Sequence, residues 1–219
     1  MLPRLVEAVS GARFATLDDL HERAIAAAVA AMEKDHRAPF RFLLKAGDWL
    51  VTWDTPWDND REKITYCRMM RLQMKAIGCE AYAFSGEVWI AAPKPGDGIN
   101  PKLPPSKRPD REDALFVMSY DKAANFRTTR FAVKRAGTPR ARLLARDDWH
   151  EIPGERKSQI NWSEGRMADM LNPAGKLHEP PEQRALFGGM PDPWEYDAPD
   201  AEEQELIFMI RAAWRKDFG

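Results

Sequence analysis

The sequence predicts an α+β fold: a mainly antiparallel sheet with helices on one face, followed by an extended C-terminal arm and a terminal helix. Three observations predict it. Several segments alternate apolar and polar side chains, which is typical of half-buried strands, and turns separate them. Two segments in the first half of the chain instead repeat their apolar residues at helical spacing. This regularity stops near Pro153 and returns only after Asp200, where a last helical pattern begins.

The first helix is expected to begin after Thr16. Threonine is a favourable N-cap, and the acids that follow it suit the positive end of a helix dipole. Small apolar residues then repeat at helical spacing as far as Met32, which suits packing on a sheet. Residues 40–44 and 49–53 alternate on either side of residues 46–48, so they predict a β-hairpin.

A second helix and four more strands are expected next. The helix begins at Asp58 or Asp60 and ends at Gly78, because glycine tolerates the left-handed conformation of helix ends. The strands are expected within residues 79–93, 114–120, 125–137 and 140–149, with a proline-rich loop at 93–112. Gly86 allows a β-bulge in the first of these strands.

The C-terminal third has a different character. Residues 153–200 hold short apolar pieces, many polar residues and repeated prolines, which predict an extended arm. The final helix begins with acids and ends with bases, as its dipole favours. Its wide apolar belt predicts burial on more than one side, against the chain itself or against a partner such as a second copy. The predicted organisation is therefore a domain of residues 1–152, an arm of residues 153–200 and a helix of residues 201–219.

Composition narrows the class of protein. Of the 219 residues, 44% are hydrophobic, and the formal net charge is -1, so no global field draws the chain to nucleic acid or to an anionic membrane. Residues 24–32, the longest helix-like apolar stretch, are too short to span a bilayer, and the first residues lack the apolar run of a secretory signal. Cys67 and Cys79 do not make a disulfide framework and are expected to be small core hydrophobes. We therefore expect a cytoplasmic protein without membrane contact.

Acidic residues offer the candidate catalytic groups. Glu87 lies in the middle of an expected strand, where an unpaired buried carboxylate would be costly, so it is the best single candidate for a catalytic or ligand-binding acid. The alternative is an outward-facing or arginine-paired glutamate, which is the commoner situation. Asp54, Asp58 and Asp60 form an acidic cluster of the kind that binds Mg²⁺ or Ca²⁺, but the spacing of a calcium loop is not met. Turn formation and helix capping explain these aspartates more simply.

Other catalytic and cofactor signatures are missing from the sequence. The four histidines are far apart, and no CxxC pair occurs, so no metal site is predicted. Neither the nucleophile elbow G-x-S-x-G nor a glycine-rich phosphate-binding motif is present, so no cofactor is predicted.

The second helix carries a candidate basic patch. It consists of Arg61, Arg68, Arg71 and Lys75, which fall on the face opposite the apolar residues. Such a patch can contact the phosphates of a nucleic acid. Acids are interspersed throughout the chain, so a solvated face is the ordinary explanation and nucleic acid is not the favoured partner.

Two blocks of sequence, EAYAFSGEVWIA and PPSKRPDREDALFVMSYD, resemble a group of uncharacterised bacterial and prophage-type proteins. In that group an aromatic strand ending in Glu-x-Trp precedes a Pro-Asp-Arg loop and another apolar strand. The likeness covers residues 40–135. It implies a bacterial, phage or mobile-element origin and carries no activity with it.

A shorter resemblance concerns the arm. Gln183, Leu186 and Phe187 form a Q-x-x-L-F segment that resembles the bacterial sliding-clamp-binding motif. In that family the glutamine enters a small polar site, and the Leu-Phe pair fills an apolar pocket on the clamp. An extended peptide with two apolar anchors suits docking in a preformed groove. Arg184 departs from the commonest pattern, in which this position is apolar. Trp194 follows in the same segment and joins the partner-binding candidates.

The arm also has a competing interpretation. Leu186 and Phe187 can equally pin the arm onto its own domain, in which case both are buried. Our leading hypothesis is a non-enzymatic protein-interaction protein of bacterial or phage origin that binds the replication clamp through its arm. The alternative is a metal-dependent hydrolase or nuclease that uses Glu87 with Asp54, Asp58 or Asp60, and this requires those acids to converge in one pocket.

Overall fold

The computed structural model describes residues 4–11, 16–57, 60–90, 108–123, 125–135, 142–150, 170–171 and 201–218. In chain order the elements are β1 (Arg4–Ser10), α1 (Leu17–Asp35), β2 (Arg41–Ala46), β3 (Trp49–Asp54), α2 (Asp60–Ile77), β4 (Ala81–Ile90), β5 (Glu112–Asp121), β6 (Phe126–Lys134), β7 (Arg142–His150) and α4 (Ala201–Phe218). The strands form one seven-stranded sheet of order β1-β3-β2-β4-β5-β6-β7, and every pairing is antiparallel. The predicted α+β class with a mainly antiparallel sheet is confirmed.

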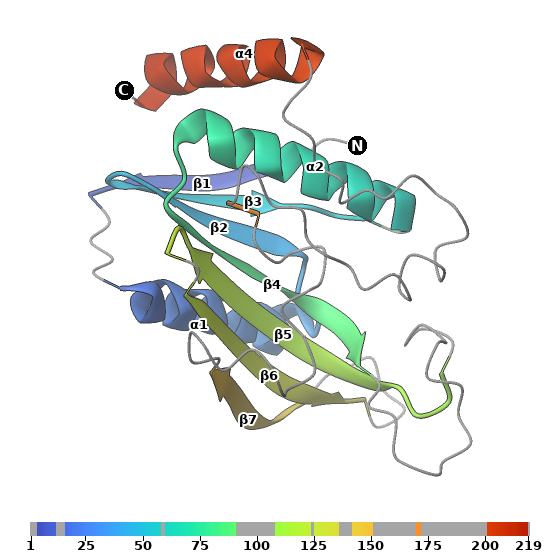
Figure 1. The fold of residues 1–219 in the computed structure, drawn as a ribbon. Helices are drawn as coiled ribbons and strands as arrows, with labels where there is room; N and C mark the ends of the chain where they lie inside the picture. Colours follow the sequence, from blue (N-terminus) through green and yellow to red (C-terminus); the bar gives the residue numbers. More distant parts are fainter. Residues whose placement is uncertain are drawn as a thin grey trace.

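The helices lie on both faces of the sheet, whereas the sequence predicted one face. Figure 1 shows α1 on one side and α2 on the other, with α4 beyond α2. The alternation of β2 explains the difference: Leu43 joins the apolar cluster beneath α1, and Phe42 and Leu44 join the cluster beneath α2. Because successive side chains of a strand point to opposite faces, two sets of apolar residues require two covering layers.

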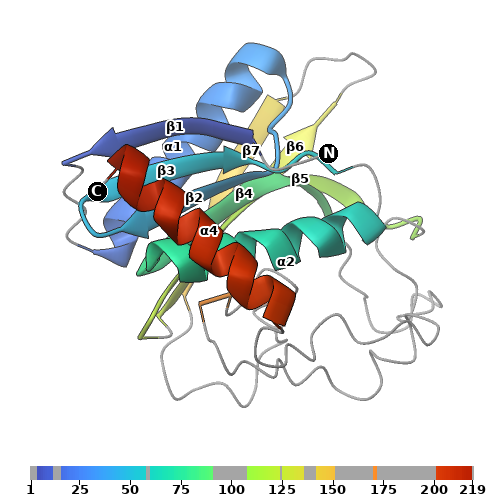
Figure 2. The ribbon, with the colours of Figure 1, turned by 90° about the horizontal axis from the view of Figure 1, so that it is seen from above.

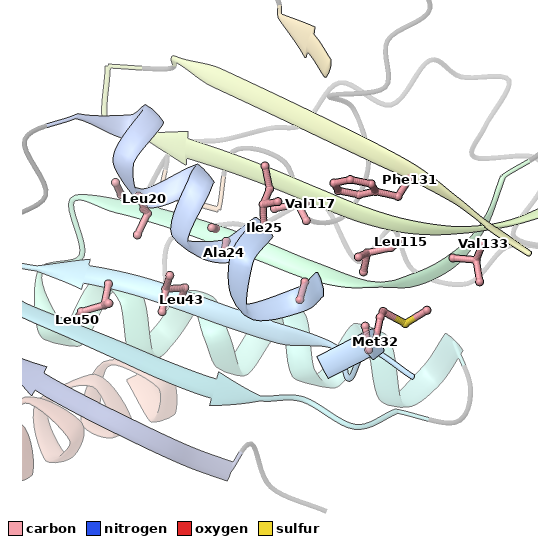
Figure 3. Packing of buried hydrophobic residues seen from close by; sticks show 14 residues of the cluster. Leu20, Ala24, Ile25, Met32, Leu43, Leu50, Leu115, Val117, Phe131 and Val133 are labelled. Atoms are coloured by element: carbon pink, nitrogen blue, oxygen red, sulfur yellow. The ribbon is translucent and has the colours of Figure 1, made fainter. Parts of the chain in front are cut away.

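The α1 side of the sheet has a core of mostly aliphatic residues (Figure 3). Thr16 begins the helix as predicted: its Oγ1 accepts a hydrogen bond from the Asp19 amide at 3.2 Å, and the Asp19 carboxylate accepts one from the Thr16 amide at 3.0 Å. This capping box satisfies amides that the first helical turn leaves without partners. Ala24 and Ala28 face the sheet and are buried, and such small side chains allow a helix to lie close to it.

The α2 side of the sheet has a core rich in aromatic and sulfur-containing residues. Met70 and Met74 of α2 pack on Tyr82 of β4 within this cluster. Cys67 and Cys79 are both free and buried, as expected for core hydrophobes. Burial raises the pKa of the Cys79 thiol to about 12, and the thiol donates a hydrogen bond to the Ala81 carbonyl. The thiol therefore stays protonated at neutral pH, which rules it out as a nucleophile.

The first strand, β1, was not predicted from the sequence. It lies at the edge of the sheet and pairs with β3, with a register shift between Leu5 and Glu7. Leu5 and Val6 are 41% and 46% exposed, and no residue of the strand is fully buried. An edge strand without a buried face has no reason to alternate apolar and polar residues, so its sequence carries no strand periodicity.

Gly86 does not form the β-bulge that the sequence predicted. The pairing of β4 with β5 runs without a register shift from Ala81 to Ile90. A Cβ atom at position 86 would lie 2.9 Å from Cε1 of Phe40 and closer still to Cδ1. Phe40 thus occupies the space of a side chain at position 86, and its ring also stacks on Trp57 with centroids 4.1 Å apart. Glycine is required here by close packing rather than by backbone conformation.

We expect Gly86→Ala to lower the free energy of unfolding by about 1–3 kcal/mol, because the added methyl group displaces an aromatic ring from its stack. Chemical denaturation of the variant measures this loss. Combining Gly86→Ala with Phe40→Leu should cost less than the sum of the two single changes, since the smaller side chain makes room for the methyl group. An unchanged midpoint for Gly86→Ala would contradict the proposed contact.

Candidate functional site

The terminal helix α4 is held on the outer side of α2. Ile207 is buried against Leu72 and Ala76 of α2, and Ile210 packs beside them. The two helices also share polar contacts, since Arg211 Nε donates a hydrogen bond to the Ala76 carbonyl at 3.2 Å. Figure 2, a view from above, shows α4 crossing over α2. The final helix therefore contacts the folded domain directly.

Two further contacts fix the ends of α4. Near its start, Glu203 is 12% exposed and pairs with Arg68 of α2. Near its end, Trp214 meets Trp49 of β3 edge to face, with ring centroids 6.1 Å apart. An edge-to-face aromatic pair adds about 0.5–1.5 kcal/mol to the gain from buried area. The helix is thus positioned along its length by apolar, ionic and aromatic contacts together.

This packing divides the predicted basic patch. Arg68 pairs with Glu203, so α4 takes up its charge. Arg71 is buried, with a relative exposure of 7%, and is not available to a phosphate on the surface. Lys75 is exposed, and the side chain of Arg61 lies outside the described residues. The sequence suggested that this face of α2 is exposed to solvent, but α4 covers part of it.

Within the expected arm, the structure describes Met170 and Leu171, which pack on the α2 side of the sheet. Met170 is 3% exposed in the cluster beneath α2, and its amide donates a hydrogen bond to the Tyr82 hydroxyl at 3.3 Å. The chain re-enters the described structure at Ala201, the first residue of α4. Residues 172–200, between these two parts of the chain, lie outside the described residues.

The predicted clamp-binding residues belong to this segment. Gln183, Leu186, Phe187 and Trp194 all lie outside the described residues. The two predictions for Leu186 and Phe187, burial against the domain and display to a partner, are tested by the variants described below.

The outer face of α4, directed away from α2, is apolar and exposed. Phe208 and Met209 have relative exposures of 71% and 61%, and that of Leu206 is 40%. Exposed large apolar side chains that lie next to one another are a feature of protein interaction surfaces. We define the outer face of α4 as Glu202, Glu205, Leu206, Phe208, Met209, Ala212, Ala213, Arg215 and Lys216. The sequence signalled it through the wide apolar belt of the final helix.

Two of the candidate catalytic acids are engaged in ion pairs. Arg135 donates to Glu87 Oε1 at 2.6 Å and to the carbonyl of His36, at the end of α1, at 3.0 Å. Glu87 is thus paired with an arginine, which was one of its two predicted interpretations. Arg41 Nε donates to Asp54 Oδ1 at 2.7 Å.

The placement of the acids separates them further. Asp54 lies on β3 and Glu87 on β4, with β2 between the two strands, so their backbones are about 10 Å apart across the sheet. Asp58 and the side chain of Asp60 lie outside the described residues. Within the part of the chain that the structure describes, no group of three or more His, Cys, Asp or Glu side chains is arranged to hold a metal ion.

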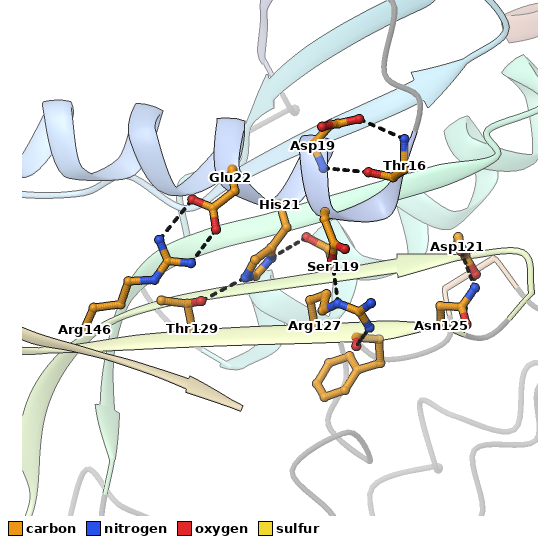
Figure 4. A network of polar contacts seen from close by, with 12 residues as sticks. Thr16, Asp19, His21, Glu22, Ser119, Asp121, Asn125, Arg127, Thr129 and Arg146 are labelled. Atoms are coloured by element: carbon orange, nitrogen blue, oxygen red, sulfur yellow. Dashed lines mark hydrogen bonds and ion pairs between the residues drawn. The ribbon is translucent and has the colours of Figure 1, made fainter. Parts of the chain in front are cut away.

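A buried polar network beneath α1 was missed from the sequence (Figure 4). His21 Nδ1 lies 2.8 Å from Ser119 Oγ, and His21 Nε2 lies 2.9 Å from Thr129 Oγ1. All three residues are buried, with exposures of 4%, 0% and 1%. The signal was present in two places: His21 falls on the apolar stripe of α1, and Ser119 shares its strand face with Val117.

Ion pairs border this network on the exposed side of α1. Arg127 of β6 donates to Asp18 at 2.6 Å, and Arg146 of β7 pairs with Glu22. Asp18 lies three residues before His21 in α1, and Glu22 lies directly after it. The two ion pairs therefore hold this part of the helix against β6 and β7 (Figure 4). The geometry is that of a structural attachment, in which ring nitrogens and hydroxyls satisfy one another within the core.

Comparisons with protein-family models, with curated proteins and with solved structures find no match to this chain. The resemblance of residues 40–135 to prophage-type proteins and that of the Q-x-x-L-F segment to clamp-binding peptides therefore stay predictions. Among the described helices, none is long and apolar enough to cross a membrane.

Proposed function

We propose that this is a non-enzymatic interaction protein of bacterial or phage origin, and that its partner is the replication sliding clamp. The observation that carries the proposal is the Gln183–Phe187 segment, Q-R-A-L-F, which lies in the chain between Met170 and α4, two parts that pack on the folded domain. Clamp binding would in turn bring the whole domain to the clamp.

The expected energetics depend on two apolar anchors. Burying a leucine or phenylalanine side chain fully is worth about 1.5–3 kcal/mol. Binding energy in peptide interfaces is concentrated in a few such anchors that fill pockets. Leu186 and Phe187 should therefore carry most of the affinity, and Gln183 should supply orientation through its amide. Arg184 contributes little and marks where the affinity can be improved.

Titration of the intact protein with a purified bacterial sliding clamp tests the proposal. We expect Leu186→Ala combined with Phe187→Ala to raise the dissociation constant at least about 100-fold. Gln183→Ala should raise it about 10-fold. Arg184→Ala is the matched control within the same segment and should leave the constant unchanged. Arg184→Leu should tighten binding, because it restores an apolar residue at the position that departs from the motif.

The same variants decide between display and anchoring. If Leu186 and Phe187 pin the arm to the domain, replacing both lowers the free energy of unfolding, as does removal of any buried apolar pair. If they are displayed, the unfolding curve is unchanged and only clamp binding is lost. Equal affinity of the wild type and the double variant, or no binding by either, would reject the clamp as partner.

A further inference from the structure

We propose that the outer face of α4 binds the outer face of α4 in a second copy of this chain, with the two helices antiparallel around Met209. This inference concerns α4 alone and does not rest on clamp binding. The side of α4 that meets α2 carries Glu203, Ile207, Ile210 and Trp214, spaced by three or four residues. The opposite side presents Phe208 and Met209 to solvent. One helix thus has two apolar sides, of which the chain itself covers one.

The distribution of charge on the outer face of α4 favours a second copy of the same helix as its binding partner. Acids occupy its beginning, at Glu202 and Glu205, and bases occupy its end, at Arg215 and Lys216. The two halves carry opposite charge, so the face is complementary to itself when a second helix runs in the reverse direction. A parallel pair would instead place acids against acids and bases against bases, which is destabilising.

The sizes of the side chains support the same arrangement. Around a two-fold axis at Met209, residues at equal distances before and after it oppose one another. Glu202 then opposes Lys216, and Leu206 opposes Ala212 of the other copy. A bulky residue against a small one allows close packing between helices. Two Met209 side chains meet at the axis, and methionine adapts readily to such contacts.

The extent of the surface sets the strength of association. A helix of 18 residues is about 27 Å long, so a single helix pair buries less than the roughly 800 Å² per partner of a standard interface. We therefore expect a dimer that forms and dissociates with concentration. Each α4 rests on its own α2 (Figure 2), so the proposed dimer would bring four helices together, with the two α4 helices between the two α2 helices.

Sedimentation of the full chain over a range of concentrations tests the association. The wild type should rise from the monomer mass of 25.0 kDa to twice that value. Phe208→Glu combined with Met209→Glu should raise the dissociation constant of the dimer by about 100-fold, since two acids would then meet at the axis and a further charge would flank each of them. Val6→Glu, at a 46% exposed apolar residue of β1, is the matched control and should leave the association unchanged. Circular dichroism confirms that each variant is folded.

Disulfide trapping tests the direction of the helices. A mixture of Glu202→Cys and Lys216→Cys chains should form a mixed disulfide, and Glu202→Cys alone should form little, because only an antiparallel pair brings these positions together. The native Cys67 and Cys79 are buried and do not compete. A wild type that stays monomeric at every concentration, a charged double variant that still dimerises, or efficient homodimer formation by Glu202→Cys would overturn the proposal. Clamp binding by the Phe208→Glu, Met209→Glu variant should persist, so failure of one proposal is distinguishable from failure of the other.

Discussion

Replacing Phe42 with alanine should lower the free energy of unfolding by about 3–5 kcal/mol. Phe42 has no exposed surface and lies on β2, between β3 and β4 near the middle of the sheet. Its ring lies 5.1 Å from that of Phe84 and 6.4 Å from that of Tyr82, centroid to centroid. Truncation removes the transfer energy of the ring and leaves a cavity that β-sheet neighbours on both sides cannot close.

The size of this effect follows from where the ring is buried, and a matched variant tests that. Phe208→Ala makes the same chemical change on the outer face of α4, where the ring is 71% exposed. We expect it to change the free energy of unfolding by less than about 0.5 kcal/mol. Urea denaturation measures the change in unfolding free energy for both variants. It is carried out at a protein concentration below that at which the chain associates. Similar losses for Phe42→Ala and Phe208→Ala would show that the core is not organised around β2. A loss of about 3–5 kcal/mol is a large fraction of the stability of an ordinary domain.

Local pattern was sufficient to predict most of the elements. The hairpin of β2 and β3 was predictable because apolar residues recur on both sides of a short glycine-containing turn, although helices cover both faces of its strands. Thr16 was predictable as an N-cap because its partner, Asp19, lies only three residues away. Interactions within one helical turn or one hairpin involve residues that are close together in the sequence, so they can be inferred without knowledge of the fold.

Features that depend on contacts between distant segments were not predictable. The role of Gly86 depends on Phe40, which directly precedes β2 and is 46 residues away in the chain, so glycine suggested a bulge where packing was the cause. The partners of His21 are 98 and 108 residues away in the chain. The pairing of Arg68 on α2 was likewise not predictable, because only the position of α4 shows that this arginine has an acidic partner. Each case depends on which segment packs against which other segment. The spacing of apolar residues along the sequence does not contain that information.

His21→Ala should lower the free energy of unfolding by about 2–4 kcal/mol. The substitution removes two hydrogen bonds in a buried site, and a buried polar group that loses its partner costs about 1–3 kcal/mol. Ser119 is fully buried, so water cannot readily replace the ring nitrogen. The network joins α1 to β5 and β6 at once, and its loss should loosen the whole helix from the sheet (Figure 4).

A double-mutant cycle separates the network from simple loss of packing. Ser119→Ala combined with His21→Ala should cost less than the two single changes together, by about 0.5–3 kcal/mol, because the second change removes a hydroxyl that has already lost this partner. Glu22→Ala is the control on the same helix: it removes an exposed ion pair with Arg146 and should cost less than about 1 kcal/mol. Additive losses, or a cost for His21→Ala no greater than that for Glu22→Ala, would mean that the buried hydrogen bonds do not attach α1. In that case its apolar face alone holds the helix on the sheet.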